Sequence, residues 1–141
     1  MTVEIRHLRP GDEPVLTRIA EEVFDHPFDP ETLGRYLESP GHLLVVAIDD
    51  GLVVGQVAAI VHRHPDRRPT ELYVDEVAVT PARQRQRIAR RMLEAMLALG
   101  REQGCQEMWV GTEPDNVAAR ALYKSLSADG ETFVMYVRKP A

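Results

Sequence analysis

The sequence is short of cysteine, of net positive charge and of long apolar runs, and each shortage excludes a class of protein. A single cysteine, Cys105, excludes an internal disulfide and a cysteine-based metal cluster, and a reducing cytoplasm is the simplest setting for such a chain. Seventeen basic residues against 22 acidic ones give a formal net charge of -5, which argues against a nucleic-acid partner and favours a cationic one. No apolar run approaches the roughly 20 residues of a membrane-spanning helix, so we expect no membrane segment.

What the sequence does contain suits one globular domain. Its 141 residues, 44% of them hydrophobic, can form one core, and no repeat or linker divides them, so we expect a single domain over residues 1–141. Apolar periodicity predicts an α/β fold in the order strand, helix, helix, three strands, helix, strand, helix, strand. The helices are expected over residues 14–24, 31–39, 88–104 and 115–126, and the last strand over residues 131–139. Asp50 and Gly51 join two apolar segments and predict a β-hairpin.

The segment TELYVDEVAV, residues 70–79, carries an irregularity. Its alternation of apolar residues shifts by one position around Asp75 and Glu76. Such a shift predicts a β-bulge, a feature often found beside active sites. Where the alternation holds, one of the two carboxylates faces the cleft and its neighbour points to the other face of the sheet.

A turn rich in arginine follows that strand. In VAVTPARQRQRIARRML, Val77–Leu93, a β-rich run breaks at Pro81 and leads directly into a helical pattern. Backbone N–H groups at the start of a helix lack intrahelical partners and carry a partial positive charge, so they bind anions. Arg85 and Arg87 add positive charge at the same place. We interpret the turn as a cradle for the phosphates of a nucleotide-like cofactor.

Together these segments resemble the GNAT superfamily of N-acetyltransferases. The motifs are VAVTPARQRQRIA and, downstream, DNVAARALYKSL, which fits N-x-x-A-x-x-L-Y-x-S-L. The family's turn reads Gln/Arg-x-x-Gly-x-Gly/Ala; Gln84 and Ala89 match it, whereas Arg87 replaces the middle glycine. The resemblance covers essentially the whole chain. It implies a mixed, mostly antiparallel sheet flanked by helices and splayed between residues 74–79 and 108–111.

The resemblance implies acetyl-coenzyme A (acetyl-CoA) as the cofactor. Backbone groups at the end of the strand would pair with the pantetheine and polarise the thioester carbonyl, and N–H groups of the turn would hold the pyrophosphate. Asn116 would hydrogen-bond the pantetheine, cap its helix, or do both. The expected cofactor-binding residues are Val77, Ala78, Val79, Gln84, Arg85, Gln86, Arg87, Ile88, Ala89, Arg90, Asn116, Ala119 and Tyr123.

Acetyl transfer to an amine requires a base, because an amine is mostly protonated at neutral pH. Glu76, at the expected bulge, is the best placed carboxylate for this role. In similar enzymes a tyrosine at the place of Tyr123 lies near the thioester sulfur and can protonate the departing thiolate; the alternative for Tyr123 is a core aromatic of its helix. The expected catalytic residues are therefore Glu76 and Tyr123. Arg87, in place of the family glycine, leaves open a non-catalytic CoA-binding domain.

A narrower similarity lies in the N-terminal half. Residues 23–59, with the strand 71–79, resemble the branch that acetylates the 3-amino group of aminoglycoside antibiotics, although Val137 and Arg138 stand where that branch is expected to have an acidic residue. Carboxylates would bind the several ammonium groups of such a substrate. The expected substrate-binding residues are Phe24, Asp25, Phe28, Asp29, Glu31, Asp75, Glu76, Glu113 and Asp115. The alternative acceptors are a peptide N-terminus, a protein lysine and a small polyamine.

No metal site is expected from the histidines. His62 and His64 alternate with Arg63 in a basic loop that would repel a cation, and no carboxylate has ligand spacing to them. Trp109, in a predicted strand, is expected in the core. The sequence thus predicts a cytoplasmic enzyme with a small cationic amine as partner, without nucleic acid or membrane, and the family resemblance adds a homodimer.

Overall fold

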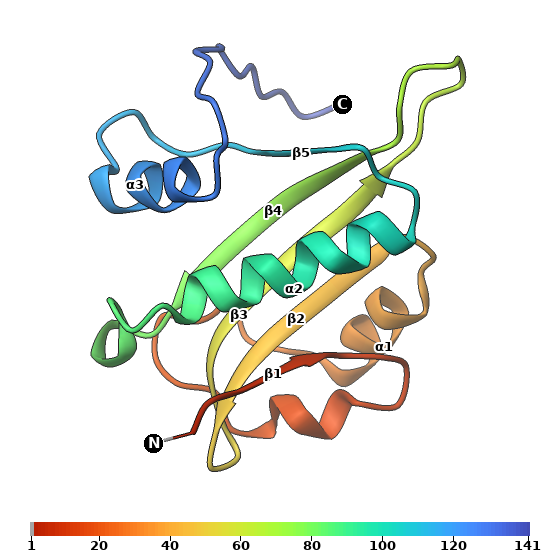
Figure 1. The fold of residues 1–141 in the computed structure, drawn as a ribbon. Helices are drawn as coiled ribbons and strands as arrows, with labels where there is room; N and C mark the ends of the chain where they lie inside the picture. Colours follow the sequence, from red (N-terminus) through yellow and green to blue (C-terminus); the bar gives the residue numbers. More distant parts are fainter. Residues whose placement is uncertain (1) are drawn as a thin grey trace. The chain divides into compact units, whose positions relative to one another are not determined.

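The structure, a computed structural model, describes residues 2–141 and divides into two compact units, Met1–Gly111 and Thr112–Ala141. No helix among the described residues is long and apolar enough to cross a bilayer. Figure 1 shows the elements, which are β1 (Glu4–His7), a 3-10 helix η1 (Glu13–Thr17), α1 (Pro30–Glu38), β2 (His42–Asp49), β3 (Leu52–His62), β4 (Glu71–Val79), a 3-10 helix η2 (Pro81–Arg83), α2 (Ile88–Glu102), β5 (Glu107–Val110) and α3 (Val117–Ser125).

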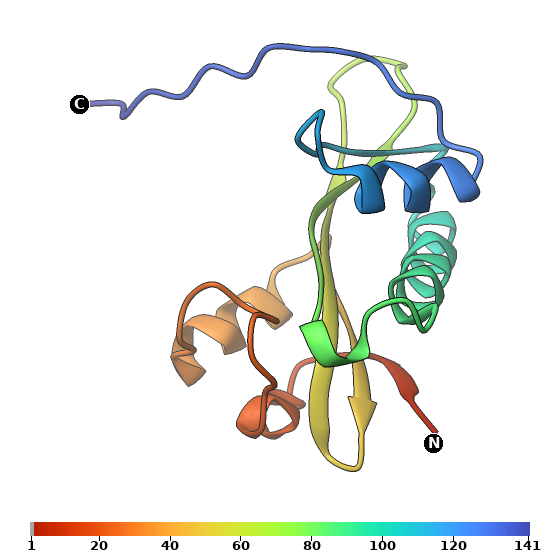
Figure 2. The same ribbon diagram turned by 90° about the vertical axis from the view of Figure 1, so that its left-hand side faces the viewer.

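The first unit is a five-stranded sheet covered by helices on both faces. The strands lie in the order β1-β2-β3-β4-β5; the pairs β1–β2, β2–β3 and β3–β4 are antiparallel, and β5 runs parallel to β4. Seen edge-on in Figure 2, α1 and η1 lie on one side of the sheet and α2 lies on the other. The prediction of a mixed, mostly antiparallel α/β sheet is therefore confirmed.

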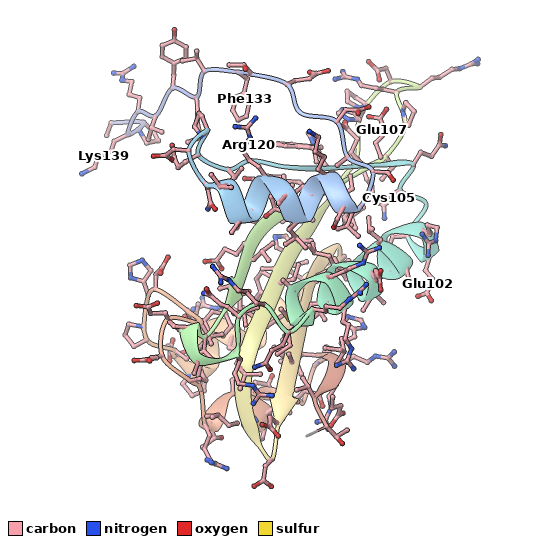
Figure 3. All side chains as sticks on the ribbon, turned by 60° about the vertical axis from the view of Figure 1, so that its left-hand side comes forward. Glu102, Cys105, Glu107, Arg120, Phe133 and Lys139 are labelled. Atoms are coloured by element: carbon pink, nitrogen blue, oxygen red, sulfur yellow. The ribbon has the colours of Figure 1, made fainter. Side chains whose placement is uncertain are left out.

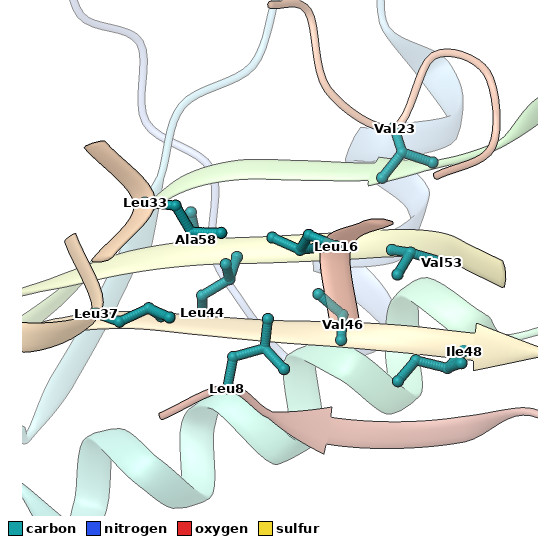
Figure 4. Close-up of a cluster of buried hydrophobic side chains, with 10 residues drawn as sticks. All are labelled: Leu8, Leu16, Val23, Leu33, Leu37, Leu44, Val46, Ile48, Val53 and Ala58. Atoms are coloured by element: carbon teal, nitrogen blue, oxygen red, sulfur yellow. The ribbon is translucent and has the colours of Figure 1, made fainter. Parts of the chain in front are cut away.

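The central hairpin of β2 and β3 carries the core. Asp50 and Gly51 both have positive φ, 49° and 78°, as a type I′ turn requires, so the predicted hairpin is confirmed. Nearly every residue of the two strands is buried, which is the pattern of strands covered on both faces. Figure 4 shows the buried cluster on the side of α1, which comprises Leu8, Leu16, Val23, Leu33, Leu37, Leu44, Val46, Ile48, Val53 and Ala58.

The other face of the sheet packs closely against α2. The predicted amphipathic helix is confirmed, and its buried residues are Ile88, Met92, Leu93, Met96 and Gly100. At Gly55 of β3, an added Cβ would lie 2.9 Å from the Met92 side chain and 3.1 Å from the Ala78 carbonyl oxygen. Because glycine has no side chain there, α2 can approach β3 closely at this point.

β4 is irregular at its two carboxylates. Val74 pairs with Ala59 of β3 and Glu76 pairs with the preceding Ala58, so Asp75 is an extra residue with no opposite partner in the register. Two residues on one strand opposing one on the other define a β-bulge. The bulge predicted from the shifted alternation is therefore confirmed.

β4 and β5 separate at the same point. In the described chain, β5 pairs with β4 from Glu71 to Val74 only, although β4 continues to Val79. The backbone of the last part of β4 therefore has β3 on one side and no paired strand on the other. This is the splay that the family resemblance predicted.

The helix predicted over residues 14–24 is wrong. Only Glu13–Thr17 is helical, as a 3-10 helix. The chain then pairs with the start of β3: the Arg18 carbonyl accepts from the Val53 N–H and the Ala20 N–H donates to the Val53 carbonyl, both at 2.9 Å. This non-local backbone pairing outweighs the helical spacing of the apolar residues, because propensity is a weak preference beside tertiary contacts.

The second unit contains α3. Asn116 is its N-cap, and the Asn116 side-chain oxygen accepts a hydrogen bond from the Ala119 N–H at 3.0 Å. The helix predicted from DNVAARALYKSL is therefore confirmed. The cap role predicted for Asn116 is confirmed as well.

The strand predicted over residues 131–139 is wrong. Within the described chain, residues 128–141 form neither helix nor strand, and Figure 3 shows the side chains of Phe133 and Lys139 on this irregular segment. A strand needs a neighbour to satisfy its backbone groups, and apolar composition alone does not supply one.

Trp109 is not a core residue. It is 40% exposed and stacks on Tyr73 of β4, with ring centroids 4.1 Å apart. Because β5 is an edge strand, its side chains have a neighbouring strand on one side only. The prediction of a buried tryptophan is wrong for that reason.

Candidate active site

Glu76 lies in the bulge among other polar groups. Partial desolvation and the nearby carboxylates of Asp75 and Asp25 raise its pKa, while a hydrogen bond from Gln56 and the charge of His26 act in the opposite direction. A carboxyl with a raised pKa is a better proton acceptor near neutral pH than an ordinary one. The environment of Glu76 therefore suits the role of base predicted for it.

Both bulge carboxylates lie on the face of the sheet that α1 covers. Burial, followed by the charges of Asp75 and Glu76, raises the pKa of the Tyr36 phenol on α1, whose hydroxyl donates to the Leu43 carbonyl at 2.8 Å. Glu76 stands opposite Ala58, which belongs to the buried cluster on the α1 side, and Asp75 is the extra residue of the bulge beside it, so the two carboxylates do not follow the simple alternation between opposite faces. The reason is the bulge, which interrupts the alternation between these two residues.

A shallow cavity of about 430 Å³, widely open to solvent, lies in the segment that precedes α1. It is lined by Leu16, Ile19, Ala20, Glu21, Glu22, Phe24, Asp25, His26, Pro27 and Phe28. The rings of Phe24 and Phe28 meet edge to face with centroids 4.5 Å apart. Three predicted substrate-binding residues, Phe24, Asp25 and Phe28, thus line one cavity, and Asp25 links that cavity electrostatically to Glu76.

Of the other predicted substrate-binding carboxylates, Asp29 and Glu31 belong to α1 and its cap, and Glu113 and Asp115 belong to the second unit. Asp29 caps α1, where its Oδ2 accepts from the Thr32 N–H at 3.2 Å and from the Thr32 hydroxyl at 2.7 Å, and these hydrogen bonds lower its pKa. Glu31 is exposed in the first turn of α1. Glu113 and Asp115 are exposed residues of the second unit. Within the first unit, the structure thus brings Asp25, Asp75 and Glu76 together but does not add Asp29 and Glu31 to them.

The turn after β4 is held by side-chain contacts within the first unit. The Gln84 amide donates to the Val79 carbonyl at 3.1 Å, and Arg83 donates to Gln86 Oε1 at 3.1 Å. Arg83 also forms an ion pair with Asp49 of β2, with both side chains mostly buried. These contacts fix the path from β4 to α2. Of the predicted cofactor-binding residues, Gln84 and Gln86 therefore support the turn itself.

The turn contains two residues in the left-handed region. Arg85 and Arg87 have φ of 63° and 64°, a conformation that favours glycine. Arg87 directly precedes α2, and the Arg91 N–H donates to its carbonyl at 3.0 Å. The N–H groups of Ile88 and Ala89 therefore belong to the first turn of the helix, where no intrahelical acceptor exists. Arg87 thus stands at the position of the family glycine in a conformation that glycine adopts without steric cost.

The remaining predicted site residues belong to α3 of the second unit. Tyr123 is half-buried, and burial raises the pKa of its phenol, which keeps its proton at neutral pH. Asn116 and Ala119 are joined by the helix cap. Tyr123 is therefore protonated and able to donate, as a general acid must be.

Two polar residues of the site were not predicted. Tyr36 contacts the backbone of β2 beneath the bulge, and Gln56, only 1% exposed, donates to the Val23 carbonyl at 3.2 Å. Gln56 could have been found, because it is the single strongly polar residue inside the apolar run LVVGQVAAIV. Tyr36 offers no such signal, since a tyrosine among the leucines of an amphipathic helix is ordinary.

The sequence matches known acetyltransferases. The profile of the Acetyltransferase (GNAT) family matches residues 5–127. The chain is 34% identical to N-alpha-acetyltransferase RimI of Mycobacterium tuberculosis over 104 residues, 74% of this chain and 63% of RimI. It is 32% identical to N-acetyltransferase 8 of Homo sapiens over 91 residues, 64% of this chain and 40% of that protein. The chain thus spans less than two thirds of the length of either relative.

Solved structures show the same fold. An aminoglycoside acetyltransferase, HMB0005, from an uncultured soil metagenomic sample superposes with a TM-score of 0.83 at 23% identity, over 99% of both chains. AAC(6′)-Iy in complex with a bisubstrate analog superposes with a TM-score of 0.83 at 19% identity, over 100% of both chains. The family match over residues 5–127, together with the splayed sheet, shows that this chain belongs to the acetyltransferase (GNAT) family.

Proposed function

We propose that this protein is an acetyl-CoA-dependent N-acetyltransferase that acts on a primary amine of a small polycationic molecule. The observation that carries the proposal is the bulge at Asp75 and Glu76, at the point where β5 stops pairing with β4. It puts a carboxyl of raised pKa beside a strand edge that can pair with a ligand. The same strand leads directly into the arginine-rich turn and α2.

The residues of the turn fit the acyl donor. Acetyl-CoA supplies the acetyl group as a thioester and carries an anionic pyrophosphate. The N–H groups of Ile88 and Ala89 face out of the helix start, and the arginines of the turn add positive charge, so this chain offers both parts of an anion site. The main chain of residues 77–79 would pair with the pantetheine and orient the carbonyl for attack.

Two side chains would move the protons of the reaction. Glu76 accepts the proton of the acceptor ammonium, directly or through water, and leaves a neutral amine able to attack. Tyr123 donates a proton to the departing sulfur, since its phenol is protonated at neutral pH. The two residues lie in different units of the structure, and we propose that both units form one catalytic domain, since the family match spans them.

The acceptor site is proposed to be the cavity before α1. It combines the Phe24 and Phe28 rings with the carboxylates of Asp25, Glu21 and Glu22, a lining suited to an amine on a carbon ring. Asp25, Asp75 and Glu76 would share several ammonium groups. We therefore propose an aminoglycoside acceptor, and retain the 3-amino group as the position to be tested.

A peptide N-terminus is the second candidate acceptor. It is favoured by the 34% identity to an N-alpha-acetyltransferase over 104 residues. A peptide offers one ammonium group on an extended backbone, whereas an aminoglycoside offers several on sugar rings. The two acceptors therefore place different demands on the acidic cavity.

A thiol-release assay with acetyl-CoA across an acceptor panel tests the proposal. The panel holds a gentamicin-type aminoglycoside, an alanyl peptide, a lysine peptide blocked at its N-terminus and a linear polyamine, and NMR of the product locates the acetyl group. We expect the highest kcat/KM with the aminoglycoside and acetylation of its 3-amino group. Acetylation at the 6′ position would keep the substrate class and correct the position, and a preference for the alanyl peptide would establish the second candidate.

A domain that only binds CoA would behave differently. Calorimetric titration would then show acetyl-CoA binding while no acceptor releases thiol. That result would refute the proposed activity and leave the anion site intact.

The homodimer predicted from the family is a separate proposal, which light scattering of the purified chain tests.

A further inference from the structure

Three side chains with metal-binding atoms converge at the end of the β3–β4 hairpin far from the bulge. His62 ends β3 and pairs in register with Glu71, the first residue of β4. His64 lies two residues further on, and its Nε2 contacts Glu71 Oε1. The rings of His62 and His64 have centroids 4.5 Å apart. One ligand atom from each of the three residues lies within 4.8 Å of the other two.

This set of ligands has the chemistry of a zinc site. Zinc binds two imidazoles and one carboxylate in tetrahedral sites, with a water in the fourth position. Ligand atoms bound at about 2.0–2.1 Å to one tetrahedral ion are about 3.3 Å apart, so small side-chain rotations would bring the present atoms to that spacing. The hairpin register already fixes the strand positions from which His62 and Glu71 project.

Burial favours binding over simple solvation of these groups. The His64 side chain is 6% exposed and that of Glu71 is 19% exposed. Polar groups removed from water need a partner, and each of these currently has the other. A cation between them would satisfy both and add the exposed His62 as a third ligand.

The charges of the loop do not oppose a cation strongly. Arg63, Arg67 and Arg68 are all exposed, where water and salt screen them, and Arg68 is paired with Asp66 at 3.4 Å. The prediction of no metal site from the histidines also assumed that no carboxylate was within reach. That assumption is wrong, because antiparallel pairing brings Glu71 opposite His62.

We infer that His62, His64 and Glu71 bind one Zn²⁺ ion. The ion would hold the loop of residues 63–70 against the ends of the two strands that it connects. The ion would tie the end of β3 to the start of β4, and binding to the folded chain would stabilise it. None of the three residues belongs to the proposed acetyl-transfer site. The inference therefore stands apart from the proposed activity.

Titration of the chelator-treated, full-length protein with zinc sulfate in competition with a chromophoric chelator tests the site. We expect one equivalent per chain in the wild type, and a loss of at least about tenfold in affinity in H62A and E71Q. H62A removes an exposed side chain and E71Q keeps the shape of the carboxyl, so both are expected to fold. H7Q is the control, because His7 lies on β1 and β2 separates it from the hairpin end.

Two further measurements separate a built site from surface binding. Zinc should raise the Tm of the wild type and of H7Q clearly more than that of H62A and E71Q at the same zinc concentration. Cobalt bound at the site should give the visible absorption of a tetrahedral ion. Zinc affinity that is equal in wild type, H62A and E71Q would overturn the inference, as would the absence of stoichiometric binding in the wild type.

Discussion

Glu76 derives its proposed role from its neighbours rather than from its residue type. Glu76 is exposed at the bulge, yet partial desolvation and the neighbouring carboxylates of Asp75 and Asp25 raise its pKa. Its raised pKa has a direct consequence for activity. The carboxyl can accept a proton only above that pKa, so kcat/KM should rise with pH through it.

Glu76→Gln should lower kcat/KM by about 10²- to 10⁴-fold at neutral pH, because the amide cannot accept the proton of the ammonium. The difference in kcat/KM between Glu76→Gln and the wild type should become smaller as the pH approaches the pKa of the acceptor amine, where free amine is already abundant. The measurement is a pH profile of thiol release for both proteins. Glu38→Gln, at an exposed position of α1, is the matched control and should keep the wild-type profile.

If Glu76→Gln has the same kcat/KM as the wild type, and the same decrease of kcat/KM at low pH, the base is another group. Asp75→Asn then becomes the informative variant, because Asp75 occupies the same bulge. If Asp75 only binds the acceptor, its loss should raise KM more than it lowers kcat.

Tyr123→Phe should lower kcat and leave the Kd for acetyl-CoA nearly unchanged, because only the proton donor is removed. Thiol release measures the first quantity and calorimetry the second. Tyr136→Phe is the matched control, since Tyr136 is 91% exposed in the C-terminal segment. Equal kcat for wild type and Tyr123→Phe would remove Tyr123 from the acid role and leave it as a packing residue of α3.

Sequence reasoning was most successful where the chemistry is local. The shifted alternation located Asp75 and Glu76 correctly, because a bulge leaves its mark on the pattern of a single strand. It missed Tyr36 and Gln56, whose part in the site depends on which elements pack on the bulge. Residue type and spacing in one segment do not contain that information.

At the scale of elements, the turn between β4 and α2 combines anion-binding geometry with backbone strain. Arg85 and Arg87 both adopt a left-handed conformation that costs an ordinary residue about 1–2 kcal/mol. The side-chain contacts of Arg83 and Gln84 hold this path. These contacts thus hold Arg87 in a conformation that favours glycine.

Arg87→Gly should raise the stability of the protein by about 1 kcal/mol, since glycine adopts positive φ without steric cost. For a chain of this size that corresponds to a rise in Tm of about 3–5 °C, measured by calorimetry. Gln86→Gly is the matched control: its φ is not positive, so glycine there should lower the Tm. A lower Tm for Arg87→Gly would show that the arginine side chain contributes more than the strain costs.

The sequence failed to predict the segments whose structure depends on residues far away in the chain. The hairpin of β2 and β3, and the helices α1, α2 and α3, follow from local turn, cap and periodicity signals. The segment around Arg18 and Ala20 instead pairs with Val53 of β3, and residues 131–139 meet no strand in the described chain. Helical or apolar spacing carries no information about such partners.

At the scale of the whole molecule, net charge matches the proposed acceptor. The chain carries a formal net charge of -5, and the cavity before α1 adds Glu21, Glu22 and Asp25 at one place. Such a field attracts cations over distances of about a Debye length, roughly 10 Å at 0.1 M salt. The number of charges on the acceptor should therefore decide how strongly salt affects the reaction.

Raising the salt concentration from about 0.02 M to about 0.5 M should lower kcat/KM for a polycationic aminoglycoside far more than for a monocationic peptide amine, because screening weakens each ammonium–carboxylate contact. The change should appear in KM, with kcat nearly constant, because screening weakens the encounter of the charged acceptor with the acidic cavity. Thiol-release kinetics at several salt concentrations measure both parameters. If the two acceptors show the same salt dependence, the acidic cavity does not recognise the additional ammonium groups, and the proposed substrate class would have to be replaced by a monocationic amine.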